Sequence, residues 1–208
     1  WAVQAQTPQG VLRTQLHIAG RHNVGNALAA TACALAAGVP LHIIEQGLHS
    51  FEPVKGRSRA FGIQCQGRNI TVVDDTYNAN PDSVRAAIDV LAELPAPRLL
   101  VLGDMGEVGN QGPEFHAEVG AYAAERGIDA MYTLGDLCVH AAQAFGQARH
   151  FDGMDSLLAS VTQNVVNFQS VVVKGSRFMK MERVVETLLS QGPMNNTHQN
   201  KKGEAHAA

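Results

Sequence analysis

The sequence of 208 residues lacks several patterns that assign a chain to a common class of enzyme. It contains no GxxxxGK[ST] phosphate-binding loop, no GxGxxG fingerprint after a strand-like segment and no GxSxG nucleophile elbow. These absences argue against a complete P-loop enzyme, a dinucleotide-dependent dehydrogenase and an α/β-hydrolase. No segment resembles a signal peptide or a membrane span, so we expect no membrane insertion.

The sequence also contains few cysteines and has only a small net charge. Cys33, Cys65 and Cys138 are scattered without CxxC or metal-ligand spacing, which predicts small buried side chains in a reducing cytosol. The histidines show no metal-ligand spacing either, so no metal site is predicted within this chain. With 16 basic and 19 acidic residues, the chain has a net charge of -3 and no basic stripe that would favour nucleic acid. We therefore expect a cytoplasmic protein that does not bind nucleic acid.

The residues that are abundant predict a folded α/β protein. Hydrophobic residues make up 45% of the chain, and runs such as 99–102 and 171–173 are apolar on both faces, as in a parallel sheet covered by helices. Strand-like and helix-like segments alternate after residue 57, which predicts a Rossmann-like, mostly parallel sheet with helices on both faces. The predicted strands cover 61–66, 70–74, 98–102, 130–134 and 170–173, and the predicted helices cover 81–94, 113–126, 136–146, 154–168 and 177–190.

The segment before this sheet has a different organisation. Residues 1–20 predict a hairpin around Gln9 and Gly10, and two helices are expected over 24–37 and 41–50. The Pro- and Gly-containing stretch 51–57 predicts a hinge between two domains. Because the chain starts at Trp1 and in the middle of a pattern, we expect a fragment of a longer protein. The polar stretch 192–208 predicts a disordered tail.

The segment 72–83 carries the clearest chemical signal. An apolar run ends in Asp74 and Asp75, and a polar loop then leads into a helix at Pro81. The carboxyl end of a parallel strand and the N-terminus of the next helix both favour an anionic ligand. Asp75 could orient a ribose hydroxyl or a metal-bound water, whereas Asn80 also fits a helix N-cap followed by proline.

Other strand ends and the hinge carry further polar side chains. Lys174, Ser176 and Arg177 suit a carboxylate or phosphate, and Asp104 and Glu107 follow another strand. Each of these loops could equally be a solvated loop. Asp136 is predicted to be a helix N-cap.

Two asparagines and two arginines complete the candidates from the residues themselves. Asn23 and Asn26 could present amides to a base edge or cap the first helix. Arg57 and Arg59 lie at the predicted hinge, where an arginine could reach a phosphate when two domains close, although exposed arginines are common.

The motifs taken together, in their order along the chain, resemble those of the Mur ligase family. They are the segment 20–30 (GRHNVGNALAA), Gly56-Arg57, the segment 74–83 (DDTYNANPDS), the segment 102–107 (LGDMGE) and the segment 173–177 (VKGSR). The resemblance covers nearly all of residues 10–190. It implies that residues 1–55 form the C-terminal part of an α/β ATPase domain and that residues 56–191 form a complete C-terminal Rossmann-like domain.

The resemblance also implies roles for the candidate residues. Asn23 and Asn26 would hold the adenine side of ATP, Arg57 would reach its γ-phosphate on domain closure, and Asp75 would contact the ribose. Tyr77 and Asn80 would lie near this nucleotide site. Lys174, Ser176 and Arg177 would lie near the incoming acceptor and the acyl phosphate. The resemblance thus implies catalytic roles for Arg57, at the γ-phosphate, and for Lys174, at the acyl phosphate. Asp104 and Glu107 would help to place the acceptor.

The DDTYNANPDS form of the third motif favours the family member that joins D-alanyl-D-alanine to UDP-N-acetylmuramoyl-tripeptide. The expected cofactors are ATP and Mg2+, whose metal ligands lie upstream of this fragment in the family, together with the phosphate-binding loop. We therefore expect the fragment to be inactive without the N-terminal domains of the same enzyme. A different Mur ligase, a folylpolyglutamate-type ligase and a stand-alone nucleotide- or dipeptide-binding module remain alternatives.

Overall fold

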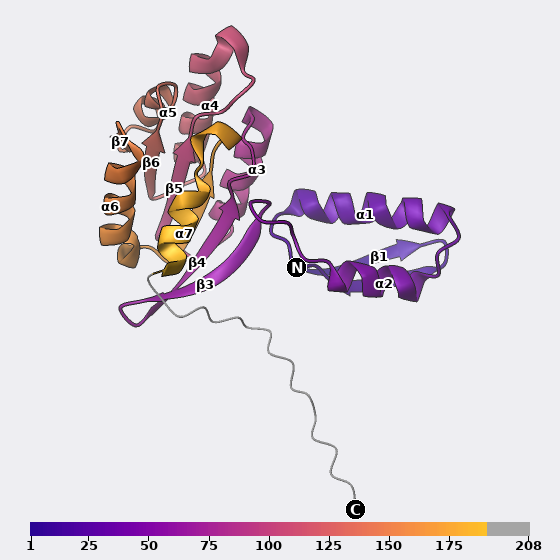
Figure 1. Ribbon diagram of the computed structural model, residues 1–208. Coiled ribbons are helices and arrows are strands. Elements are labelled where there is room, and N and C mark those ends of the chain that lie inside the picture. Colours follow the sequence, from indigo (N-terminus) through magenta and orange to yellow (C-terminus); the bar gives the residue numbers. More distant parts are fainter. Residues whose placement is uncertain (191–208) are drawn as a thin grey trace, which may run out of the picture.

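A computed structural model describes residues 1–190 of the chain (Figure 1). The predicted disordered tail, residues 192–208, lies outside the described residues. Figure 1 shows a layered α/β body with a smaller unit, formed by the first fifty residues, at its side. None of the helices within residues 1–190 has the length and apolar character needed to cross a bilayer.

The smaller unit contains the predicted hairpin and two helices. Strands β1 (Ala2–Thr7) and β2 (Gly10–Gln15) pair antiparallel, and the turn between them ends at Gly10, whose φ of 124° favours glycine. Helices α1 (Arg21–Ala36) and α2 (Leu41–Ser50) follow. Leu12, Leu16 and Ile44 supply buried apolar side chains in this small unit.

The larger body is built on a six-stranded sheet with the order β3-β4-β8-β5-β6-β7. Only the edge strand β3 is antiparallel to its neighbour, which confirms the predicted mostly parallel sheet. Strand β8, the last strand within residues 1–190, lies between β4 and β5. The strands are β3 (Arg59–Cys65), β4 (Arg68–Asp75), β5 (Arg98–Gly103), β6 (Ala130–Leu134), β7 (Arg149–Phe151) and β8 (Ser170–Lys174).

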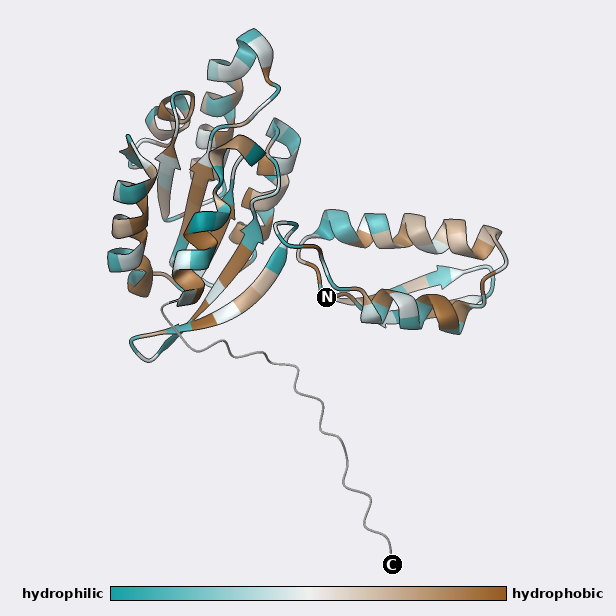
Figure 2. Cartoon of the chain, in the orientation of Figure 1, coloured by the Kyte–Doolittle hydropathy of each residue, from teal (hydrophilic) through white to brown (hydrophobic). Residues whose placement is uncertain are grey.

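Helices cover both faces of this sheet, as the apolar strand runs predicted. Alternate residues of β8 illustrate this, because Val171 and Val173 pack on one face and Val172 on the other. Helices α6 and α7 cover the first face, and α3, α4 and α5 cover the second. Figure 2 shows hydrophobic residues concentrated in the central strands. The helices are α3 (Pro81–Ala92), α4 (Gly112–Glu125), α5 (Cys138–Phe145), α6 (Met154–Asn164) and α7 (Glu182–Ser190).

The structure differs from the sequence-based expectation in several details. Strand β7 was not predicted, and short 3-10 helices occupy Val165–Asn167 and Arg177–Met179, where continuous α-helices were expected. The expectation of three buried cysteines is wrong for Cys33, which is exposed, whereas Cys138 is buried. The division into domains at residues 55 and 56 stays a prediction.

Candidate functional site

Three of the predicted strand-end loops meet because β8 lies between β4 and β5. The loop after β8 is tied to both neighbours: the Ser176 N–H donates to the Asp104 carbonyl (3.0 Å), and the Ser176 hydroxyl donates to the Ala79 carbonyl (3.4 Å). The carboxyl ends of adjacent parallel strands share one edge of a sheet, where ligands bind in open α/β folds. Strand order thus places the conspicuous motifs of the sequence side by side.

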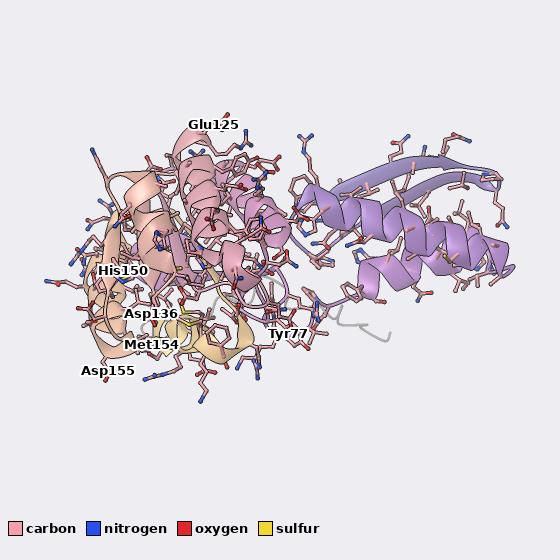
Figure 3. All side chains as sticks on the ribbon, turned by 90° about the horizontal axis from the view of Figure 1, so that it is seen from above. Tyr77, Glu125, Asp136, His150, Met154 and Asp155 are labelled. Atoms are coloured by element: carbon pink, nitrogen blue, oxygen red, sulfur yellow. The ribbon has the colours of Figure 1, made fainter. Side chains whose placement is uncertain are left out.

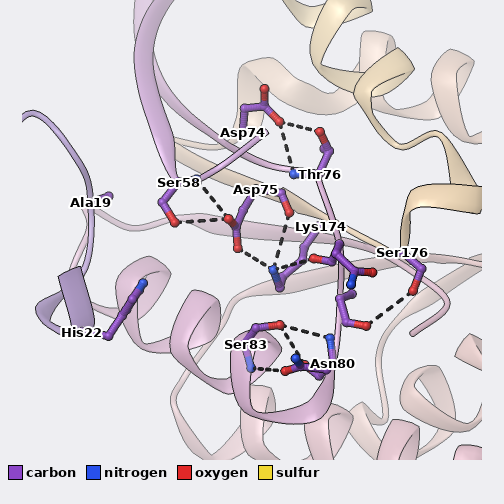
Figure 4. A network of polar contacts seen from close by, with 12 residues as sticks. Ala19, His22, Ser58, Asp74, Asp75, Thr76, Asn80, Ser83, Lys174 and Ser176 are labelled. Atoms are coloured by element: carbon purple, nitrogen blue, oxygen red, sulfur yellow. Dashed lines mark hydrogen bonds and ion pairs between the residues drawn. The ribbon is translucent and has the colours of Figure 1, made fainter. Parts of the chain in front are cut away.

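A buried ion pair links β8 to the end of β4 (Figure 4). The Lys174 ammonium lies 2.5 Å from Asp75 Oδ2 and also donates to the Asn78 carbonyl (3.0 Å) and the Asp75 carbonyl (3.5 Å). Lys174 is only 2% exposed, and all three of its ammonium protons have protein acceptors. The ammonium therefore holds the loop after β4 and has no donor left for a ligand in this arrangement.

Asp75 keeps some capacity to accept a further hydrogen bond. Its Oδ1 accepts from the Ser58 N–H (3.0 Å) and the Ser58 hydroxyl (3.1 Å), and its Oδ2 accepts from Lys174. A carboxylate offers about four lone-pair positions, so about one remains. Asp75 can accept one hydroxyl group, such as that of a ribose, without losing its protein partners.

Asp74 has an internal role. Its side chain is almost completely buried, with Oδ2 accepting from the Gly56 N–H (3.0 Å) and Oδ1 accepting from the Thr76 N–H and hydroxyl. Adjacent aspartates at the end of β4 thus fix the backbone on either side of Arg57, one at Gly56 and the other at Ser58.

A pocket of about 400 Å³ lies beside these aspartates, between α1, the hinge and the loop after β4. Its size falls within the range usual for small-molecule sites. Sequence-predicted residues from four separate motifs line it together. They are Asn23, Asn26, Arg57, Asp75, Tyr77, Asn80 and Lys174.

The asparagines of α1 face this pocket without capping their helix. The N-cap position is Gly20, and no side chain caps α1. Asn23 Nδ2 donates to the Ala19 carbonyl (2.7 Å), and Asn26 Nδ2 donates to Asn23 Oδ1 (3.1 Å). The capping alternative is therefore not supported for these two residues, and their amides form a short polar chain along the pocket wall.

Arg57 and Tyr77 stack at the same pocket. The guanidinium carbon of Arg57 lies 4.0 Å from the centroid of the Tyr77 ring, within the range of a cation–π contact. Figure 3 shows Tyr77 on the side of the larger body that faces the N-terminal helices, with Asp136 farther from them. Arg59, the other arginine of the predicted hinge, instead lies over Phe61 (5.9 Å) and does not line the pocket.

Asn80 has the capping role that its sequence predicted. Its Oδ1 accepts from the Ser83 N–H (2.8 Å), and the Ser83 hydroxyl in turn accepts from the Asn80 N–H (3.0 Å), which completes a capping box with Pro81 at the start of α3. Asn80 also lines the pocket, and the helix that it caps fixes its position there.

Asp104 has an internal role. Its side chain is buried, and its oxygens accept from the Leu137 N–H (3.3 Å) and the Cys138 N–H (2.7 Å) at the N-terminus of α5. The substrate contact expected from sequence stays a prediction. The prediction that Asp136 is the N-cap of this helix is wrong, because α5 starts at Cys138 with no cap from its own residues and Asp104 reaches the same N–H groups from another loop.

His116 and Cys138 surround Asp104 in a cluster that is compact enough for a metal ion. The hydrogen bonds argue against one. His116 Nε2 accepts from the Met105 N–H (2.9 Å) and Nδ1 donates to the Gly112 carbonyl (2.6 Å), so no imidazole lone pair is left for a metal. Burial raises the pKa of the Cys138 thiol well above its usual range, reinforced by the Asp104 carboxylate, so this thiol stays protonated.

The stability of the fold should depend on pH through His116. Burial lowers the pKa of this imidazole, against the opposing influence of the Gly112 carbonyl and Asp104. In the unfolded chain the His116 imidazole is protonated near pH 6.5, whereas in the folded chain it is protonated only at lower pH. The free energy of unfolding should therefore fall as the pH drops below about 6.5. Urea denaturation between pH 7.5 and 5.5 measures this slope.

Two variants test whether His116 causes that slope. His116→Gln should flatten it in this window, whereas His42→Gln, on the exposed side of α2, should leave the wild-type slope in place. Equal slopes for the wild type and His116→Gln would show that other groups cause the pH dependence.

One of the remaining predicted residues, Glu107, lies beside a second cleft. Glu107 is exposed and has a φ of 58°, which is unusual for a residue with a side chain, and it lines a cleft of about 570 Å³ with Asn80 and Gly106. Ser176 is buried, but Arg177 is exposed and pairs with Glu182 (3.4 Å). Arg177 and Glu107 are thus the accessible charges expected from sequence on these two loops.

Sequence reasoning missed two contributors to the site: Ser58 supplies two hydrogen bonds to Asp75, and Thr76 supplies two to Asp74. It also missed the contact between Arg57 and the ring of Tyr77, although both residues were predicted at the site. The only signal for them was their position beside the motifs, which does not say which way a side chain points.

Comparisons with known proteins identify relatives of this chain. Residues 58–177 match the family model described as Mur ligase, glutamate ligase domain. The chain is 39% identical over 189 residues to the UDP-N-acetylmuramoyl-tripeptide–D-alanyl-D-alanine ligase of Escherichia coli (strain K12), covering 90% of this chain and 41% of that protein. It is 40% identical over 188 residues to the ligase of the same name from Haemophilus influenzae, covering 88% of this chain and 40% of that protein.

A solved structure is also similar to this chain in its fold. The crystal structure of MurF from Acinetobacter baumannii superposes with a TM-score of 0.79 at 36% sequence identity, covering 91% of this chain and 42% of that one. The chain thus spans about two fifths of the length of these relatives. Because the family model covers more than half of the chain, from Ser58 through the VKGSR motif, the chain belongs to the Mur ligase family.

Proposed function

We propose that this chain is the C-terminal part of an ATP-dependent ligase that joins D-alanyl-D-alanine to UDP-N-acetylmuramoyl-tripeptide in the cytoplasm, during peptidoglycan precursor synthesis. The observation that carries the proposal is the pocket in which seven residues from four sequence motifs meet. The identity to ligases of that name supports the choice of substrates. The remaining domains of the enzyme would supply the other walls of the site.

The pocket suits a nucleotide. Asn23 and Asn26 would present amides to the adenine, and Asp75 would accept from a ribose hydroxyl with its remaining lone pair. Arg57 would contact the terminal phosphate, because its guanidinium makes no ion pair within residues 1–190 and so keeps its donors for an anion. Tyr77 and Asn80 would line the same space.

The acceptor would bind on the neighbouring loops. Arg177 is an exposed cation in the 3-10 turn after β8 and suits the carboxylate of a dipeptide, while Glu107 suits an ammonium group. Lys174 and Asp104 would act indirectly, by holding the residues around the site. Lys174 binds the loop after β4, and the Asp104 carbonyl accepts from the Ser176 N–H. We therefore assign positioning roles to Lys174 and Asp104.

The reaction requires two bond changes at the tripeptide carboxyl group. Transfer of the γ-phosphoryl group of ATP to the carboxylate would give an acyl phosphate and ADP. The dipeptide amine would then attack the carbonyl carbon, phosphate would leave, and the amine would lose a proton. Mg2+ would neutralise phosphate charge, and positioning and charge stabilisation supply most of the catalysis in such a step.

The magnesium ligands would come from the other domains of the enzyme. The acidic side chains nearest the pocket, Asp74 and Asp75, are held by protein donors, and the Asp104 cluster has no free imidazole lone pair. This agrees with the absence of a GxxxxGK[ST] loop from the sequence. The hinge over 51–57 would allow the domains to close over the nucleotide.

A direct test uses the complete enzyme and measures amide product from ATP and UDP-N-acetylmuramoyl-tripeptide. D-alanyl-D-alanine should be used, and single amino acids should not. Product with a single amino acid instead would indicate a different ligase of the family. Nucleotide binding without any amide product would favour a binding module.

Replacing Arg57 by alanine in the complete enzyme should lower kcat by about 10- to 1,000-fold, because charge on the transferring phosphoryl group loses a partner. Steady-state product formation at saturating ATP measures this. Arg68→Ala removes an exposed guanidinium at the opposite end of β4 and serves as the control. An equal rate for Arg57→Ala and the wild type would remove Arg57 from the phosphate site.

A further inference from the structure

The backbone around Arg57 is fixed to the loop after β4. The Gly56 N–H donates to Asp74 (3.0 Å), the Tyr77 N–H donates to the Gly56 carbonyl (2.9 Å), and the Ser58 N–H donates to Asp75 (3.0 Å). The residues before and after Arg57 therefore move with β4. The backbone on either side of Arg57 is thus anchored to β4 and the loop that follows it.

Gly56 allows Tyr77 to come this close. Its φ is 82°, and a Cβ atom there would lie 3.0 Å from the Tyr77 nitrogen and 3.2 Å from the Tyr77 Cβ. A side chain at this position would be strained by its backbone angle and would push Tyr77 away. The close approach places the Tyr77 ring directly under the Arg57 guanidinium.

The kind of contact matters for an arginine that must bind a ligand. A carboxylate partner would occupy the N–H donors of Arg57 and neutralise its charge. An aromatic face contacts the flat side of the guanidinium and leaves the five in-plane N–H donors available. Tyr77 is 44% exposed and lines the pocket together with Arg57.

Among the side chains that line the pocket, Arg57 is the cation with unused donors. The Lys174 ammonium has three protein acceptors. Restricting the long Arg57 side chain in advance would reduce the conformational freedom that it must lose when a phosphate binds.

We infer that Tyr77 is a positioning residue for Arg57: its ring holds the guanidinium at the pocket with its donors directed toward the phosphate end of a bound nucleotide. This inference rests on the proposed function for the identity of the ligand. The contact itself rests on geometry alone.

A double-mutant cycle in the complete enzyme tests the inference. Tyr77→Leu should lower kcat by roughly 3- to 30-fold, the range expected from loss of a cation–π contact. Tyr77→Phe, which keeps the ring, should lose less than Tyr77→Leu. In an Arg57→Ala background, Tyr77→Leu should change kcat by less than about twofold, because the two residues act as a unit. The same loss in both backgrounds, or no loss in either, would overturn the inference.

Nuclear magnetic resonance of the 208-residue chain separates the contact from the catalytic proposal. The side-chain Nε–Hε signal of Arg57 should be shifted upfield by the ring current of Tyr77, and the shift should disappear in Tyr77→Leu and persist in Tyr77→Phe. An unshifted signal in the wild type would overturn the contact. If the shift is present but the complete enzyme forms no amide product, the contact is real but the proposed function is wrong. Tyr77 would then have no positioning role in that reaction.

Discussion

Lys174→Met should lower the free energy of unfolding by about 3–5 kcal/mol, the loss expected when one partner of a buried ion pair is removed. The ammonium of Lys174 is nearly inaccessible, and without it the Asp75 carboxylate keeps its burial but loses its charged partner. The Asn78 carbonyl also loses a donor. Urea denaturation followed by far-UV circular dichroism measures the change.

The same substitution at an exposed lysine provides the control. Lys55 pairs with Glu186 on the surface, where both side chains are more than half exposed, so Lys55→Met should barely move the urea midpoint. Adding Asp75→Asn to Lys174→Met should recover part of the loss, because the uncompensated charge is then gone. If Lys174→Met and Lys55→Met had equal midpoints, the buried pair would not be important for stability.

Gly120→Ala should cost about 3 kcal/mol or more, because α4 and α5 cross with their backbones in contact at this residue. A Cβ atom on Gly120 would lie 2.2 Å from the carbonyl oxygen of Ala141 and 2.8 Å from its carbonyl carbon. Neither atom belongs to a flexible side chain, so the helices themselves would have to separate. The measurement is again the free energy of unfolding in urea.

Gly62→Ala is the matched control within the same body. Gly62 is exposed in β3, and no atom lies within 4 Å of the position that its Cβ would take. Because glycine in a strand interior is less favourable than alanine, this variant should be neutral or more stable by up to about 1 kcal/mol. A Gly120→Ala protein as stable as Gly62→Ala would contradict the close crossing of α4 and α5.

The sequence predicted the features that depend on neighbouring residues. Asn80 and Pro81 are adjacent, and this pair predicted the start of α3 correctly. The apolar runs around Val101 and Val172 predicted central strands covered on both faces, because both faces of those strands are buried. Strand β7 has three residues, two of them exposed, and such a short polar edge strand has no comparable pattern.

Features that depend on distant residues could not be predicted from sequence. Asp104 caps α5 across 34 positions of sequence, so the local pattern at Asp136 suggested the wrong residue. Lys174 was expected to contact substrate because it ends a strand beside glycine and serine. Whether such a side chain turns toward a ligand or toward Asp75 depends on which strands are neighbours, and the spacing of residues along the chain does not contain that information.

The position of β8 has a consequence for how the chain acquires its structure. Of the six strands in this sheet, β8 is synthesised last, yet it is the one that joins β4 to β5. A nascent chain that has not reached Ser170 holds two separate strand groups, and the backbone N–H and C=O groups along the edges of β4 and β5 cannot yet pair with β8. Such long-range pairing is slow to form and leaves hydrophobic surface open in the meantime. The sheet should therefore close late, and a chaperone would have the longest access to the unpaired edges of β4 and β5.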